Sequence, residues 1–182
     1  MKHEIFDKTL KIVDTDITFE QIYDKEYIPK EYLEDIKKAN FLIIPNEGFR
    51  DAGDVLFPET TLEFFDFIRD SSGEEVVADI AISGEDFQRI ELHSASIEVA
   101  TIIVESAIFN IAIGIVSAFL YDLIKKYRRT PEETSAKVKI ITKETKTKKS
   151  KMITYEGPVS GVKDALDQAA KNLFSEGREN DD

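Results

Sequence analysis

Histidine and cysteine, the residues that most often carry catalysis or bind transition metals, are scarce in this 182-residue chain. It has two histidines, His3 and His93, and no cysteine, which excludes disulfides, thiolate metal sites and cysteine nucleophiles. A serine–histidine–acid triad would have to use His93, and no G-x-S-x-G pattern marks a serine as its nucleophile. The phosphate-binding patterns G-x-x-x-x-G-K-[ST] and G-x-G-x-x-G are also missing. The sequence therefore predicts no catalytic residue, no cofactor and no metal centre.

Carboxylates offer an alternative, because magnesium-dependent nucleases hold metal and phosphate with an acid on one strand and an acid-x-lysine on the next. Asp79, followed by Glu91-Leu92-His93, approaches this pattern with His93 in the lysine position. Lys137 or Lys139 would then orient the phosphate. In a chain with 36 acidic residues such near-matches also arise by chance.

A polar loop is the first candidate binding site. It follows a short apolar run at residues 41–44, and ligands of open α/β sheets bind where strands end. The candidate binding residues are Asn46, Glu47, Arg50, Asp51 and Asp54. In the competing interpretation, Gly48 and Gly53 only shape turns and Arg50 pairs with its acidic neighbours.

The charges are segregated along the chain. The net charge is −12, yet residues 125–151 contain 11 lysines and arginines and only three acids. An acidic body repels nucleic acid, whereas one basic segment can contact an acidic partner or serve as a solvated hairpin. The predicted basic patch consists of Lys125, Lys126, Arg128, Arg129, Lys146, Lys148 and Lys149.

Alternating apolar runs and helical periodicities predict the elements that would position these residues. Residues 41–44, 76–82 and 87–93 are typical of strands, and helices are expected at residues 31–39 and from residue 60 or 61 to about residue 70. The order strand, helix, strand indicates one parallel crossover, while the third strand could also lie antiparallel.

One long helix is predicted from about residue 97 to residue 127. Sixteen of its positions, residues 106–121, carry no charge. A membrane span of about 20 residues would have to include Glu105, which disfavours that interpretation. Small side chains four residues apart form a seam that would let another helix or a sheet approach closely, and we expect a homodimer or obligate complex there. The predicted interface residues are Ser106, Asn110, Gly114 and Ala118.

The C-terminal part predicts a hairpin over residues 137–142 and 152–155, followed by an amphipathic helix. The expected fold class is α+β: a small mixed sheet with flanking helices, one long buried central helix, and a C-terminal β-hairpin plus helix. The expected organisation is an α/β body at residues 1–130, a ββα lobe at residues 131–175 that packs on the body, and a disordered tail at residues 176–182.

Residues 87–174 resemble small effector-associated domains of bacterial conflict systems, proteins encoded beside antiviral effectors. The shared layout is a strand, an alanine- and isoleucine-rich helix ending in a basic cluster (ELHSASIEVATIIVESAIF…LIKKYRR), a charged hairpin (AKVKIITKE, MITYEGPVS) and a closing helix (GVKDALDQAA). The resemblance implies an accessory role without catalysis.

Together these observations predict a cytoplasmic, non-enzymatic interaction or accessory module whose partner is another protein or a second copy of the chain. The alternatives are a magnesium-dependent phosphodiesterase or nuclease working through Asp79 and Glu91, and a single-span membrane protein.

Overall fold

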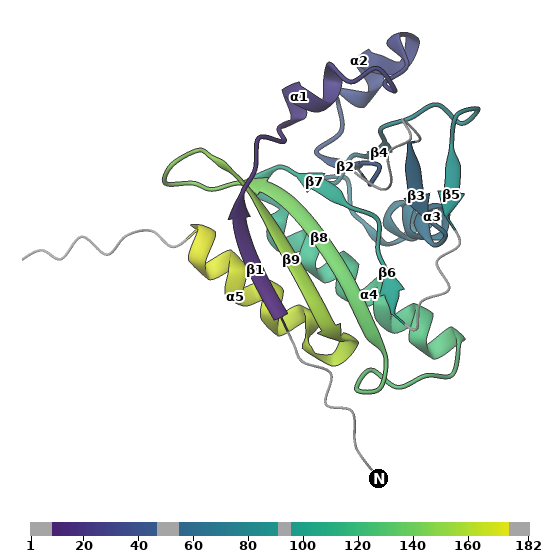
Figure 1. The fold of residues 1–182 in the computed structure, drawn as a ribbon, viewed down its shortest axis with the longest axis vertical. Helices are drawn as coiled ribbons and strands as arrows, with labels where there is room; N and C mark the ends of the chain where they lie inside the picture. Colours follow the sequence, from purple (N-terminus) through teal and green to yellow (C-terminus); the bar gives the residue numbers. More distant parts are fainter. Residues whose placement is uncertain (1–8, 47–54, 91–95, 175–182) are drawn as a thin grey trace, which may run out of the picture.

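A seven-stranded mixed sheet is the centre of the fold (Figure 1). The structure, a computed structural model, describes residues 9–46, 55–90 and 96–174. Strands follow the order β1-β9-β8-β7-β2-β4, with β6 also pairing with β8. The bounds of these strands are β1 Thr9–Asp14, β2 Phe41–Ile43, β4 Ala78–Ile80, β6 Ile97–Glu98, β7 Ile102–Val104, β8 Ser135–Lys143 and β9 Ser150–Pro158. A separate two-stranded sheet pairs β3 (Leu56–Pro58) with β5 (Gln88–Ile90).

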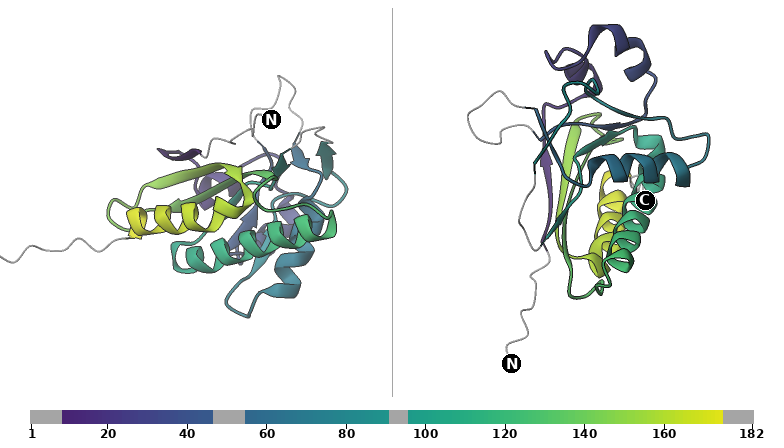
Figure 2. Two further views of the ribbon diagram at one scale, coloured as in Figure 1. Left: turned by 90° about the horizontal axis from the view of Figure 1, so that it is seen from below. Right: turned by 90° about the vertical axis from the view of Figure 1, so that its right-hand side faces the viewer.

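Helices cover the two faces of the main sheet unequally. The long helix α4 (Phe109–Lys126), extended at its start by the 3₁₀ turn η2 (Ser106–Ile108), lies on one face beside α5 (Val162–Phe174), which follows the turn η3 (Val159–Gly161). Helix α3 (Thr61–Ser71) packs against α4 on the same side. The opposite face carries α1 (Phe19–Tyr23), η1 (Lys30–Tyr32) and α2 (Leu33–Ile36) at one end of the sheet (Figure 2).

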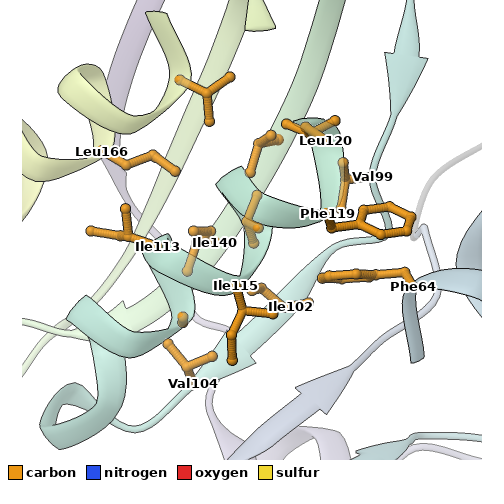
Figure 3. Packing of buried hydrophobic residues seen from close by; sticks show 14 of the residues in the cluster. Phe64, Val99, Ile102, Val104, Ile113, Ile115, Phe119, Leu120, Ile140 and Leu166 are labelled. Carbon is orange, nitrogen blue, oxygen red and sulfur yellow. The ribbon is translucent and has the colours of Figure 1, made fainter. Parts of the chain in front are cut away.

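The main core lies between the sheet and α3, α4 and α5 (Figure 3). Ile113 and Leu120 of α4 and Ile140 of β8 are all buried in this core. The rings of Phe64 on α3 and Phe119 on α4 lie 4.8 Å apart between centroids. Such close packing joins α3 and α4 into one layer.

The hairpin β8–β9 forms because each strand alternates apolar and polar side chains. Ala136, Val138 and Ile140 enter the main core, whereas Lys137 and Lys139 point to the other face. Strand β1, which was not among the predicted elements, pairs antiparallel with β9 along its whole length. The hairpin is therefore part of the same sheet as β1, β7 and β2.

The predicted α+β fold class is confirmed, with a mixed sheet, a long central helix and a C-terminal strand pair plus helix. The parallel crossover is confirmed too, since β2 and β4, which precede and follow α3 in the chain, pair in parallel. The predicted strand at residues 87–93 is placed differently: its described part, β5, pairs with β3 rather than joining the main sheet.

The predicted start of the long helix is wrong. Residues 97–104 contain the strands β6 and β7, and the helix begins only after Glu105. The segment IEVATIIV is rich in β-branched residues, which favour strands, and Ile102–Val104 is buried between β2 and β8. Thr101, between these two strands, is buried and donates its hydroxyl proton to Asn46 Oδ1 at 3.2 Å.

Candidate interaction surface

Helix α4 divides its residues between a buried face and an exposed one. Phe109, Ile113 and Leu120 are among the residues that pack into the core. The four residues of the predicted seam, Ser106, Asn110, Gly114 and Ala118, are all exposed. A Cβ atom built on Gly114 meets no atom within 4 Å, so the seam has room on its outer side. The structure thus places the predicted interface residues together on one open helix face.

Large apolar side chains accompany this seam. Ile111 is 36% exposed and Tyr121 is 45% exposed, and both point outward from α4. Seven large apolar side chains are exposed in the described residues; two of them are on α4, and Leu62 and Tyr127 lie on α3 and directly after α4. Four of the seven are therefore on α3, on α4 or directly after α4.

A shallow hollow of about 560 Å³ lies over the C-terminal half of α4. Its wall includes Phe67 of α3 together with Ala118, Tyr121 and Asp122 of α4. We call the following residues the α4 patch: Phe67, Ala118, Tyr121, Asp122, Lys125 and Arg129.

Some charged side chains at or beside the α4 patch form ion pairs, and others do not. Lys126, just beside it, donates to Glu63 Oε1 at 2.8 Å, and this hydrogen bond raises the pKa of the Lys126 ammonium group. Within the part of the chain that the structure describes, neither Asp122 nor Lys125 has an ion pair. Asp122 acts on Lys126 only as a further, smaller cause of its raised pKa. One carboxylate and one ammonium group, three residues apart on the same exposed face, are thus available to a partner.

The predicted basic patch is split by the fold. Lys125, Lys126, Arg128 and Arg129 lie at the C-terminal end of α4, near the start of β8. Lys146, Lys148 and Lys149 lie in the turn between β8 and β9, at the opposite end of a nine-residue strand (Figure 1). Such a strand spans about 30 Å. The seven residues therefore form two basic clusters rather than one patch.

Of the five candidate binding residues in the polar loop after β2, the structure describes Asn46. Its amide Nδ2 donates to Glu98 Oε1 at 3.3 Å, and its backbone N–H donates to the carbonyl of Leu56 at 3.0 Å. Asn46 thereby ties together the ends of β2, β3 and β6. The other candidate binding residues, Glu47, Arg50, Asp51 and Asp54, lie outside the described residues.

Of the alternative catalytic residues Asp79, Glu91 and His93, the structure describes Asp79. Glu91 and His93 lie outside the described residues. Asp79 is on β4, whose Ile80 N–H donates to the Asp79 carboxylate at 2.8 Å. Strands β2 and β7 separate β4 from β8, which carries Lys137 and Lys139. Lys137 forms an ion pair with Glu156 at 3.1 Å. Among the residues with described positions, no three histidine or acidic side chains are grouped to hold a metal ion.

The segment Ser106–Lys126 is the one helix within the described ranges that is long and apolar enough to cross a membrane, and 61% of its most apolar window is buried inside the protein. Comparison of the chain with protein-family models, curated proteins and solved structures found no match.

Proposed function

We propose that this protein is a non-enzymatic interaction module, an accessory subunit that binds a protein partner through the exposed face of α4. The observation that carries the proposal is the exposure of Ile111 and Tyr121 beside a seam of small side chains and a hollow lined by Phe67. Clustered exposed apolar side chains with a polar rim are typical of protein-binding surfaces.

The cytoplasm is the proposed location, and an accessory role in a bacterial conflict system is the proposed setting. The setting rests on the resemblance of residues 87–174, whose described part has a strand, an apolar helix with a basic end, a hairpin and a closing helix in that order. The short strands β6 and β7 precede the helix and were not part of that layout.

Site-specific photo-crosslinking in cells of the native host tests the proposal. A benzophenone amino acid placed at Tyr121 should form a covalent adduct with a protein when irradiated. Tyr32, on η1, is the matched control because it is a tyrosine with 50% exposure and lies on the other face of the sheet. Adducts at position 121 and none at position 32 support the proposal. Equal adduct yields at the two positions, or none at either, contradict it.

A further inference from the structure

We infer that the partner of the α4 patch is a second copy of this chain, bound about a two-fold axis that passes between Asp122 and Lys125. The inference rests on the proposed function and adds the identity of the partner. An isologous interface needs a patch that complements itself, because each copy presents the same residues to the other.

The shape of the α4 patch meets this requirement. Tyr121 projects from the patch with 45% of its surface exposed, and the hollow lined by Phe67 and Ala118 lies beside it. In a two-fold arrangement the ring of Tyr121 from each copy enters the hollow of the other. Aromatic side chains that fill a partner's pocket carry much of the binding energy in protein interfaces.

The charges of the patch are also self-complementary. Asp122 and Lys125 lie one helical turn apart, and an axis between them sets each carboxylate opposite the ammonium group of the other copy's Lys125. Two copies with a net charge of −12 each repel one another at long range, so a self-interface requires local attraction. The two Asp122–Lys125 pairs across the axis supply it.

The axis also fixes which part of α4 meets the other copy. With Asp122 opposite the other copy's Lys125 on antiparallel helices, Tyr121 lies opposite Lys126. The contact is therefore made by the C-terminal part of α4, with Phe67 of α3 and Pro131 beside it.

Reciprocal charge exchange tests this geometry by sedimentation velocity at micromolar to near-millimolar protein concentrations. The wild type should dimerise. Asp122→Lys and Lys125→Asp should each weaken the dimer by about tenfold or more, because either change sets two like-charged pairs across the axis. The double variant Asp122→Lys/Lys125→Asp restores both attractions and should dimerise within about threefold of the wild type.

Two further variants keep the test independent of folding and of net charge. Lys139→Asp makes the same charge change as Lys125→Asp on the far face of the sheet and should leave the dimer intact. Tyr121→Ala removes an exposed ring, so the monomer should keep its urea midpoint while the dimer weakens.

A wild type that stays monomeric at all these concentrations overturns the inference. A dimer that survives the single charge changes also overturns it. So does a double variant that fails to dimerise. The crosslinking result separates this failure from that of the proposed function. An adduct at position 121 with twice the mass of the chain supports self-association. An adduct of another mass overturns it and leaves the interaction module in place.

Discussion

Three buried side-chain atoms in the described residues have no hydrogen-bond partner: Gln21 Oε1, Ser117 Oγ and Thr142 Oγ1. Ser117 is 6% exposed on α4 and Thr142 is 1% exposed on β8. A buried polar group without a partner costs about 1–3 kcal/mol. Thr101 is equally buried, but its hydroxyl bonds to Asn46, so burial alone does not decide which hydroxyl is unfavourable.

Removing the two unpartnered hydroxyls should therefore stabilise the protein. Ser117→Ala and Thr142→Val should each raise the free energy of unfolding by about 1 kcal/mol, because the lost group has no hydrogen bond to lose. Urea denaturation followed by circular dichroism measures the change. Thr101→Val is the control and should lower the free energy of unfolding by about 1 kcal/mol. A Ser117→Ala variant less stable than the wild type would contradict the account.

Asp79 gives a stability effect that depends on pH. Burial raises the pKa of its carboxyl group, the Ile80 N–H acts against this rise, and Asp35 adds to it. A raised pKa in the folded state means that stability is highest below the unfolded value and is lost as pH rises through the folded value.

Asp79→Asn should accordingly raise the free energy of unfolding at pH 7, and the gain should vanish on acidification below the ordinary aspartate pKa of 3.8. The amide oxygen that this substitution introduces can still accept the Ile80 N–H. Urea titrations across this pH range measure the difference. Asp66→Asn, at an exposed position of α3, controls for the loss of one negative charge. A gain that persists unchanged at acidic pH would count against burial as its cause.

Helix α4 ends in a backbone turn that its sequence does not favour. Arg128 has a φ of 53°, in the left-handed region. The turn is closed by the Arg129 N–H, which donates to the carbonyl of Ile124 at 2.8 Å. Glycine is the usual residue at such a helix end because it has no Cβ to clash.

Arg128→Gly should raise the free energy of unfolding by about 1 kcal/mol, since it relieves the left-handed conformation. Arg128→Ala removes the same side chain and keeps the Cβ, so it should give no such gain. Thermal melts of the two variants measure the difference. Equal melting temperatures for the two would show that the φ of residue 128 costs nothing.

The main sheet joins segments from both ends of the described chain. β1, which begins at Thr9, pairs with β9, which ends at Pro158, while β8 pairs with β7 and β6. The main core likewise draws on α3, α4 and α5 together. A molecule whose sheet and core are shared in this way should unfold as one unit.

Residues 131–174 alone should therefore remain unfolded, because β8 would lose β6 and β7, β9 would lose β1, and α5 would lose α4. In the intact protein, far-UV circular dichroism and the near-UV signal of the tyrosines should report one coincident urea transition. Two separated transitions, or a folded isolated hairpin-plus-helix, would show that the C-terminal segment is an independent unit.

The sequence by itself was sufficient to predict elements whose conformation depends on residues close together in the chain. The residues Thr18-Phe-Glu-Gln21 match the capping-box pattern of a helix start, and Thr18 accepts the Gln21 N–H at 3.0 Å. The alternating residues of β8 and β9 indicated a hairpin. The four-residue spacing of the seam placed Ser106, Asn110, Gly114 and Ala118 on one helix face. These signals depend on neighbours within a few residues, which the sequence shows directly.

The pairing of strands far apart in the chain could not be predicted from local sequence patterns. Residues 97–104 are apolar enough for either a buried helix or buried strands, and pairing of β7 between β2 and β8 settled the choice. The separation of the two basic clusters depends on the length of β8, and the exposure of the seam depends on which side of α4 meets the sheet. Such outcomes arise from contacts between residues far apart in the chain, where several packings satisfy the same local pattern and only the shared core selects one.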